Sequence, residues 1–450
     1  MTEPSLYTAT EASRGATAAA AGLVWLRRGL IAYPLAWALG LGGVYPLAVS
    51  LVALYAEVVG ARRPLRVPAE CLWLGLFLFA YGGALIHAIV AGGFGAQRYM
   101  ASMYNWTVWV AGGTAFVLVW NGRHDHAGLR GLLEAVRFLG LLAAGVTVVL
   151  AALWVAGARE VHLTAPVAYL VPGGLRLSSP PLVQSMLHPP LLVRDWLLAI
   201  PIPRVAVLHP YPNALALSAV FALASHLFIA RQAAGRLRVR DGAVAILLLI
   251  PIVLTWQRTV FIALAAGAAA YLTIWLRPSL LRVVGIGAGL LIAVLAAPVL
   301  REAAVAAAEF VQAARAGSTS ARLEAYRDAA SVFHEQPLIG LGVKPREEDR
   351  ALSVGSHSTY LGTLMKSGLL GAAMLALFLS TAVALALRAL FRDPHHAVIG
   401  VSVGVLLIWL AVEDLDAAAL VALEAFVMLG VLRTLSQDRD VRRVLPAAVT

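Results

Sequence analysis

Long apolar runs constrain the fold of this chain more than any other feature of its sequence. Several exceed 18 residues, which is enough for a helix to cross the roughly 30 Å of hydrocarbon in a bilayer. Of the 450 residues, 60% are hydrophobic and only 13% are charged, whereas about a quarter of a soluble globular protein is charged. Repeated spans of this length indicate helices and exclude a β-barrel. The sequence therefore predicts an all-α polytopic membrane protein.

About twelve spans can be drawn, with both chain termini on the cytoplasmic side. Arginines flank 29–60 on both sides, which favours a hairpin of two short helices there, because basic loops tend to stay in the cytoplasm. The segments 1–26 and 433–450 are then cytoplasmic tails of a single membrane domain covering 1–450. The remaining spans are expected at 70–90, 102–120, 131–155, 212–230, 242–256, 259–275, 283–299, 357–390, 397–411 and 417–432.

Two long polar segments interrupt the apolar pattern, at 156–209 and 300–356. Under the twelve-span count both fall on the outer side of the membrane, together with the short break around Gln257. Loops longer than about 15 residues are uncommon unless they are functional. The many prolines of the first segment predict an ordered but irregular lid, and the second begins as alanine-rich helical sequence. We therefore expect a functional site on the outer face.

The charges and the single cysteine exclude several classes of site. The net charge is +11, but the basic residues are scattered between apolar spans, which indicates cytoplasmic loops and no nucleic-acid partner. Lysine occurs only at Lys344 and Lys366. Cys71 is the one cysteine, so neither a disulfide framework nor a thiolate metal site is expected. With no His/Cys cluster, Walker loop or dinucleotide fingerprint, the sequence predicts no metal and no cofactor.

Two arginines on the outer side are candidates for binding a diphosphate, because guanidinium groups match phosphate oxygens. Arg258 lies between two apolar runs, where an arginine is costly unless it reaches water or meets an anion. Arg322 falls in the first turn of a helix that 317–320 can cap, and free backbone N–H groups there also favour anions. Each has a structural alternative: an ordinary interfacial arginine at 258, or an arginine at 322 paired with Glu324 or Asp328.

His357 stands where the second polar segment meets an apolar run. A histidine with a pKa near neutrality can accept a proton from an attacking hydroxyl, although a histidine at a helix start is more often structural. Glu413, Asp414 and Asp416 cluster in the last outer loop; a solvated turn is favoured there over a proton or cation site in a transporter. Asn213 fits a helix cap better than a sugar ligand. Further candidates for substrate binding are Arg194, Arg204, His209, Asn213, Arg327 and Tyr360.

Four pieces of the sequence, taken in order, resemble the O-antigen ligase and polymerase superfamily. They are 210–216, 255–259, 320–322 leading to 336–342, and His357-Ser358 followed after nine residues by 368–371. The last piece resembles the ligase signature, a histidine, a small polar residue and two glycines three apart. Gln257 stands where many relatives have serine, and Ser358 replaces a common asparagine.

The resemblance implies a metal-independent glycosyltransferase with a class C type membrane fold in the inner membrane of a Gram-negative bacterium. Its donor would be a glycan on undecaprenyl diphosphate, used at the periplasmic face among the membrane lipids. By position, Arg258 and Arg322 would hold the diphosphate and His357 would act as the base. The signature favours a ligase, whose acceptor is the lipid A-core oligosaccharide, over a polymerase. A secondary transporter is the alternative from another class.

Overall fold

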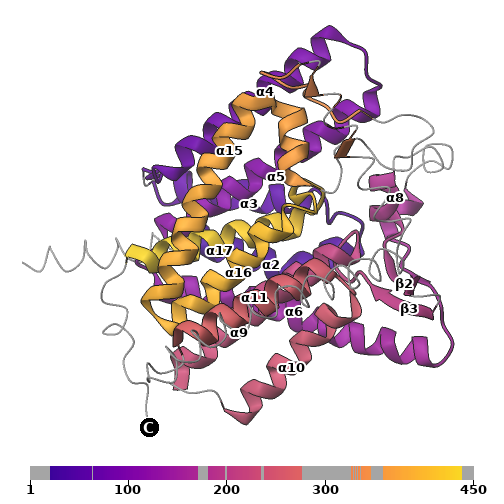
Figure 1. The fold of residues 1–450 in the computed structure, drawn as a ribbon, viewed down its shortest axis with the longest axis vertical. Helices are drawn as coiled ribbons and strands as arrows, with labels where there is room; N and C mark the ends of the chain where they lie inside the picture. Colours follow the sequence, from indigo (N-terminus) through magenta and orange to yellow (C-terminus); the bar gives the residue numbers. More distant parts are fainter. Residues whose placement is uncertain are drawn as a thin grey trace, which may run out of the picture.

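The computed structural model describes residues 21–62, 64–170, 181–197, 200–234, 238–275, 336–345 and 358–437, together with scattered positions between 326 and 334. The expected span at 283–299 and the predicted site residues Arg322 and His357 lie outside the described residues. Helices dominate the described part of the chain and run side by side as a bundle (Figure 1).

The N-terminal half of the bundle begins with two helices that pack against each other, as the predicted hairpin requires. Helix α2 already begins inside the segment expected to be a tail. The helices of this half are α2 (Ala21–Ala38), α3 (Tyr45–Tyr55) with its π-helical continuation η1 (Ala56–Gly60), α4 (Glu70–Ala91), α5 (Ala96–Asn121) and α6 (His126–Val155).

The C-terminal half holds the most deeply buried helices. They are α9 (Pro212–Ala234), α10 (Val239–Leu254), α11 (Arg258–Trp275), α15 (Thr359–Arg392), α16 (Pro394–Trp409) and α17 (Ala419–Gln437). Helices α4, α6, α9, α11, α15 and α17 are each long and apolar enough to cross a membrane. This confirms the prediction of an all-α polytopic membrane protein.

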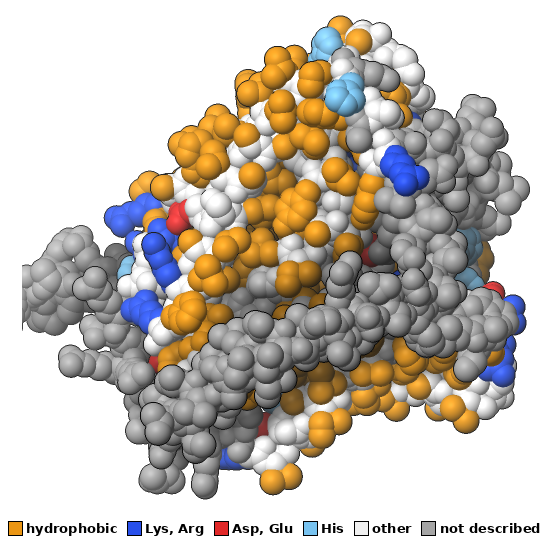
Figure 2. Space-filling model, viewed as in Figure 1, with side chains coloured by type: hydrophobic (Ala, Val, Ile, Leu, Met, Phe, Trp, Pro, Cys, Tyr) orange, Lys and Arg blue, Asp and Glu red, His pale blue; other side chains and the backbone are white. Residues whose placement is uncertain are grey.

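Helices α9 and α17 form the centre of the bundle. In each of these two helices 89% of the residues in its apolar 18-residue stretch are buried, whereas in α11 only 11% are buried. Helix α17 packs against α5, α9, α15 and α16, and the ring of Phe426 lies where a side chain at Gly112 would otherwise be. The described part of the face drawn in Figure 2 is mostly apolar, with basic side chains gathered at its left edge. Such a surface suits lipid rather than water.

The two ends of the bundle differ in their chemistry. At one end, called here the polar end, α9, α11, α15 and α17 begin and α10 and α16 finish, and their connecting loops hydrogen-bond to one another. At the opposite end, called the basic end, arginines bind backbone carbonyls and one carboxylate of neighbouring helices. These contacts are Arg231 to Pro394, Arg392 to Ser436 and Arg433 to Glu70.

A small antiparallel sheet lies on the polar end, in the segment for which an irregular lid was predicted. Its strands are β1 (Val161–His162), β2 (Pro190–Leu197) and β3 (Ile200–Val205), in the order β1-β2-β3. The segment also holds η2 (Pro166–Tyr169) and α8 (Pro181–Leu187). The prediction was wrong for the strands because their prolines occupy tolerated places. Pro190 is the first residue of its strand, and Pro201 and Pro203 lie on an edge strand.

Candidate functional site

The helix that follows His357 is broken, and a distant segment fills the break. Helix α15 has non-helical backbone at Gly368, with φ 60° and ψ −166°. The segment 336–345 docks there and hydrogen-bonds to the backbone on both sides of the break. Its bonds are Leu341 N–H to the Met365 carbonyl (2.7 Å), Gly342 N–H to Lys366 (2.9 Å) and, in return, Leu369 N–H to Pro337 (2.8 Å). Backbone groups freed within a membrane protein need such partners, so the two motifs form one structural unit.

Glycines make this close approach feasible. A Cβ on Gly368 would lie 2.3 Å from the Leu338 carbonyl oxygen, and one on Gly340 would lie 2.4 Å from the Gly368 nitrogen. Gly340 also has φ of 78°, a left-handed conformation that favours glycine. Gly340 and Gly368, one from each piece, therefore let the two backbones pack directly against each other. They fix the direction of the first turns of α15, where the polar end begins.

Two buried ion pairs fasten this unit to the loop between α16 and α17. Lys344 of the docked segment pairs with Asp414, and Lys366 of α15 pairs with Asp416. Asp416 also accepts a hydrogen bond from the indole N–H of Trp109 at 3.3 Å. The solvated turn expected at these acids is wrong, since all four charged side chains are buried. The two ammonium groups compensate the carboxylates, which makes that burial tolerable.

A second polar network centres on Glu413 in the same loop. Its carboxylate accepts hydrogen bonds from the side-chain amides of Asn213 and of Gln257, the latter at 3.4 Å. The amide oxygen of Asn213 in turn accepts from Arg204 at 2.8 Å, and Arg204 pairs with Asp195 of β2 at 3.0 Å. The helix cap predicted for Asn213 is wrong. It is the second residue of α9, and its side chain joins the sheet to the helix bundle.

The start of α15 binds the same glutamate. The backbone N–H and the hydroxyl of Thr359 both donate to the Glu413 carbonyl, at 3.0 and 2.8 Å. Ser358 caps the helix by accepting from the Leu361 N–H at 3.3 Å. Thr359 is two residues after His357, and Gln257 directly precedes Arg258. Residues close in sequence to Arg258 and to His357 therefore both hydrogen-bond to Glu413.

Arg258 is the first residue of α11 and is half-buried. Its guanidinium is thus carried at a helix N-terminus, where free backbone N–H groups favour an anion. The turn before it is strained, because Trp256 has a φ of 52°, which is uncommon for a bulky residue. Arg204 supports this turn by donating to the Thr255 carbonyl at 3.1 Å. Strain held in place by surrounding structure is often found at functional sites.

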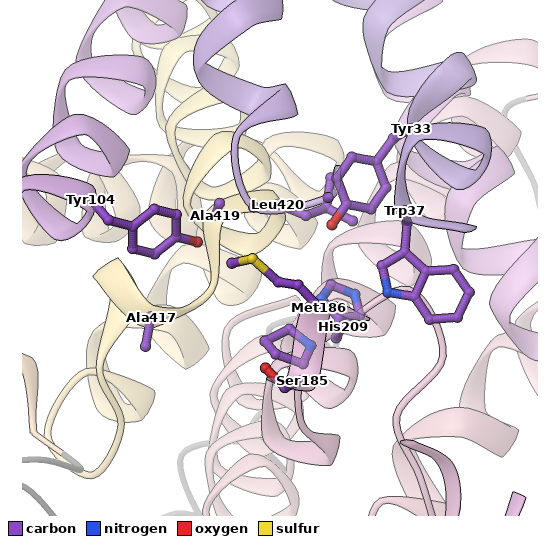
Figure 3. A pocket seen from close by; sticks show the side chains of 12 residues that line it. Tyr33, Trp37, Tyr104, Ser185, Met186, His209, Ala417, Ala419 and Leu420 are labelled. Carbon is purple, nitrogen blue, oxygen red and sulfur yellow. The ribbon is translucent and has the colours of Figure 1, made fainter. Parts of the chain in front are cut away.

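His209, a further substrate-binding candidate, lines a small buried pocket beside this network. Figure 3 shows Tyr33 and Trp37 of α2 and Tyr104 of α5 among the lining side chains, with Met186 next to His209. Burial lowers the pKa of His209 to about 3, so the imidazole is neutral. Its Nδ1 atom has no partner within the described part of the chain. The cavity measures about 30 Å³, which is enough for water and too small for a sugar ring.

The other predicted residues divide into two groups. Arg204 and Asn213 belong to the Glu413 network. Arg194 on β2 and Arg327 are exposed, and Tyr360 is 40% exposed with its hydroxyl donating to the Leu407 carbonyl at 2.9 Å. Sequence reasoning missed the roles of Lys344, Lys366, Gln257 and Glu413. One signal was available, because the only two lysines of an arginine-rich chain are the two that pair with the acidic loop.

These features define a multi-pass helical membrane protein with a buried polar network at one end of its bundle. Residues 243–376 match the family model described as O-antigen ligase, and three of the four motif pieces lie within that range. The match confirms the resemblance of this part of the chain to the O-antigen ligase and polymerase superfamily. Comparison with curated proteins and with solved structures gave no match.

Proposed function

We propose that this protein is an O-antigen ligase. It transfers a glycan from undecaprenyl diphosphate to a sugar hydroxyl of the lipid A-core oligosaccharide. The observation that carries the proposal is the convergence on Glu413 of Gln257, next to Arg258, and Thr359, close to His357. The family match covers Arg258, Arg322 and His357 together.

The roles follow from the chemistry of the three side chains. Arg258 and Arg322 hold the donor diphosphate and stabilise the negative charge that grows on it as the glycosidic bond breaks. His357 takes the proton from the acceptor hydroxyl, which attacks the anomeric carbon from the face opposite the diphosphate. A single displacement of this kind inverts the anomeric configuration. No metal is needed in this scheme because the arginines supply the positive charge.

The charge distribution supports a periplasmic reaction. Arg231, Arg392 and Arg433 lie at the basic end, and cytoplasmic loops of membrane proteins carry an excess of arginine and lysine. The polar end then faces the periplasm of a Gram-negative inner membrane. Donor and acceptor are both amphiphiles, so a site at a bundle end lets their lipid parts stay in the bilayer while the sugars meet in water.

A reconstituted reaction tests the proposal. Purified protein is mixed with lipid-linked glycan and rough lipopolysaccharide in a chelating buffer, and the product is resolved by gel electrophoresis. We expect a ladder on the lipid A core that disappears in His357→Ala and persists in the control His124→Ala, whose side chain is exposed near the basic end. Glycan added only to a second lipid-linked unit would make the protein a polymerase. A product with retained anomeric configuration would contradict the single displacement.

A further inference from the structure

A cavity of about 300 Å³ lies between α9, α11 and α16, and none of its lining residues belongs to the polar network described above. A volume of this size is at the lower end of what small-molecule sites have. Leu272 on its rim is 52% exposed, so the cavity opens to the surroundings of the bundle. Apart from one arginine, one tyrosine and one serine its lining is apolar. The lining includes Val220, Leu223 and Leu227 of α9, Leu264 and Ala268 of α11, and Val401 of α16.

The arginine closes one end of this groove. Arg231, in the last turn of α9, donates to the hydroxyl of Tyr271 and to the carbonyl of Pro394 at 3.3 Å. Its guanidinium also lies 5.3 Å from the centre of the Tyr271 ring. Neither of these partners carries a negative charge. A half-buried cation at the edge of hydrocarbon is stabilised by an anion, so an anionic group in the groove would bind favourably to Arg231.

The length of the groove matches one leaflet of a bilayer. Val220 and Arg231 are eleven residues apart on α9, which corresponds to about 16 Å of helix axis. One leaflet contributes about 15 Å of hydrocarbon, half of the whole core. If the apolar part of the groove lies among the acyl chains of one leaflet, the Arg231 guanidinium lies at the level of the lipid head groups. Asn213 at the polar end is eighteen residues from Arg231, or about 27 Å, so a donor diphosphate at the polar end cannot reach this arginine.

We infer that this groove binds an anionic phospholipid of the leaflet at the basic end. One acyl chain lies between α9 and α11, and the phosphate accepts hydrogen bonds from the Arg231 guanidinium. The inference depends on the arrangement of the helices and not on the reaction proposed above. The bound lipid fills a gap in the bundle and links the basic ends of three helices.

Native mass spectrometry of the delipidated full-length protein, titrated with dioleoyl phosphatidylglycerol, tests this inference. We expect one tightly bound lipid in the wild type and an affinity at least tenfold lower in Arg231→Gln. The matched control is Arg240→Gln, at the same end of the bundle with a side chain that is 73% exposed, and it should bind like the wild type. Ala268→Leu narrows the groove while leaving the arginine in place, and it should also weaken binding.

Three results would overturn the inference. Arg231→Gln could bind phosphatidylglycerol as tightly as the control variant does. Dioleoyl phosphatidylcholine could bind the wild type equally well, which would remove the role of the negative charge. Undecaprenyl phosphate could displace the phospholipid at equal concentration, which would assign the groove to a prenyl chain. If Arg231→Gln loses its helical circular dichroism, Ala268→Leu decides, and unchanged binding there refutes the groove as the site.

Discussion

Removing one partner of the buried pair between Lys366 and Asp416 should destabilise the protein strongly. Both side chains are 2% exposed, and breaking a buried ion pair leaves an uncompensated charge that costs about 3–5 kcal/mol. For Lys366→Met we expect the lower part of this range, about 3 kcal/mol, because the Trp109 N–H still donates to Asp416. The matched control is Arg130→Met. It breaks a pair with Glu134 that is 45% and 34% exposed, and such pairs contribute less than about 1 kcal/mol.

The assay is unfolding of the purified protein in mixed micelles as the denaturing detergent is increased, followed by circular dichroism. The double variant Lys366→Met, Asp416→Leu removes both charges and should recover most of the loss, because apolar replacements of buried pairs are often neutral. Burial opposes ionisation of Asp416, but the nearby ammonium groups of Lys366 and Lys344 outweigh it and hold the pKa of Asp416 below its usual range. Removing Lys366 takes away the largest of these opposing effects and should raise this pKa, so we expect Lys366→Met to be more stable at pH 5 than at pH 8. A loss below about 1 kcal/mol with no dependence on pH would refute the reasoning.

Three further predictions concern the polar end. Gly368→Ala forces a Cβ against a backbone carbonyl and should cost at least about 2 kcal/mol in the same unfolding assay, whereas Gly404→Ala meets no atom within 4 Å and should be neutral or stabilising. In the folded protein His209 stays neutral between pH 7.5 and 5.5, because burial lowers its pKa to about 3. In the unfolded protein the same imidazole becomes protonated over this range. Stability should therefore fall by about 1.4 kcal/mol more in the wild type than in His209→Asn between pH 7.5 and 5.5; parallel curves would contradict this. Glu413→Gln removes the carboxylate that accepts two amide hydrogen bonds and should lower the transfer rate at least tenfold while helix content is unchanged; wild-type transfer would show that the network is not needed.

The positions of the membrane helices could be predicted from the sequence because hydropathy and length are local properties. The span expected at 70–90 is helix Glu70–Ala91, and the span at 212–230 begins at Pro212. The ends of helices that extend beyond the hydrocarbon were harder to predict. The span expected at 102–120 begins six residues earlier, at Ala96, since a helix continues past the hydrocarbon wherever its sequence allows.

The buried acids could not be predicted because their burial depends on partners far away in the chain. Asp414 lies 70 residues from Lys344, and nothing local distinguishes a solvated acidic turn from one covered by lysines. The break in α15 has the same origin. The glycines of 368–371 were recognised as a motif, but the segment 336–345 that fills the break is only visible once the chain has folded. The strands of the proline-rich segment were missed because proline usually opposes a sheet.

Binding of undecaprenyl diphosphate, measured beside glycan transfer, most directly tests the proposed roles of Arg258 in holding the donor diphosphate and of His357 as the base. Arg258→Gln should weaken binding of undecaprenyl diphosphate at least tenfold and abolish transfer. His357→Gln should bind the lipid like the wild type and transfer nothing. If Arg258→Gln binds the lipid normally, or His357→Gln still joins glycan to the lipid A core, the proposed roles are contradicted.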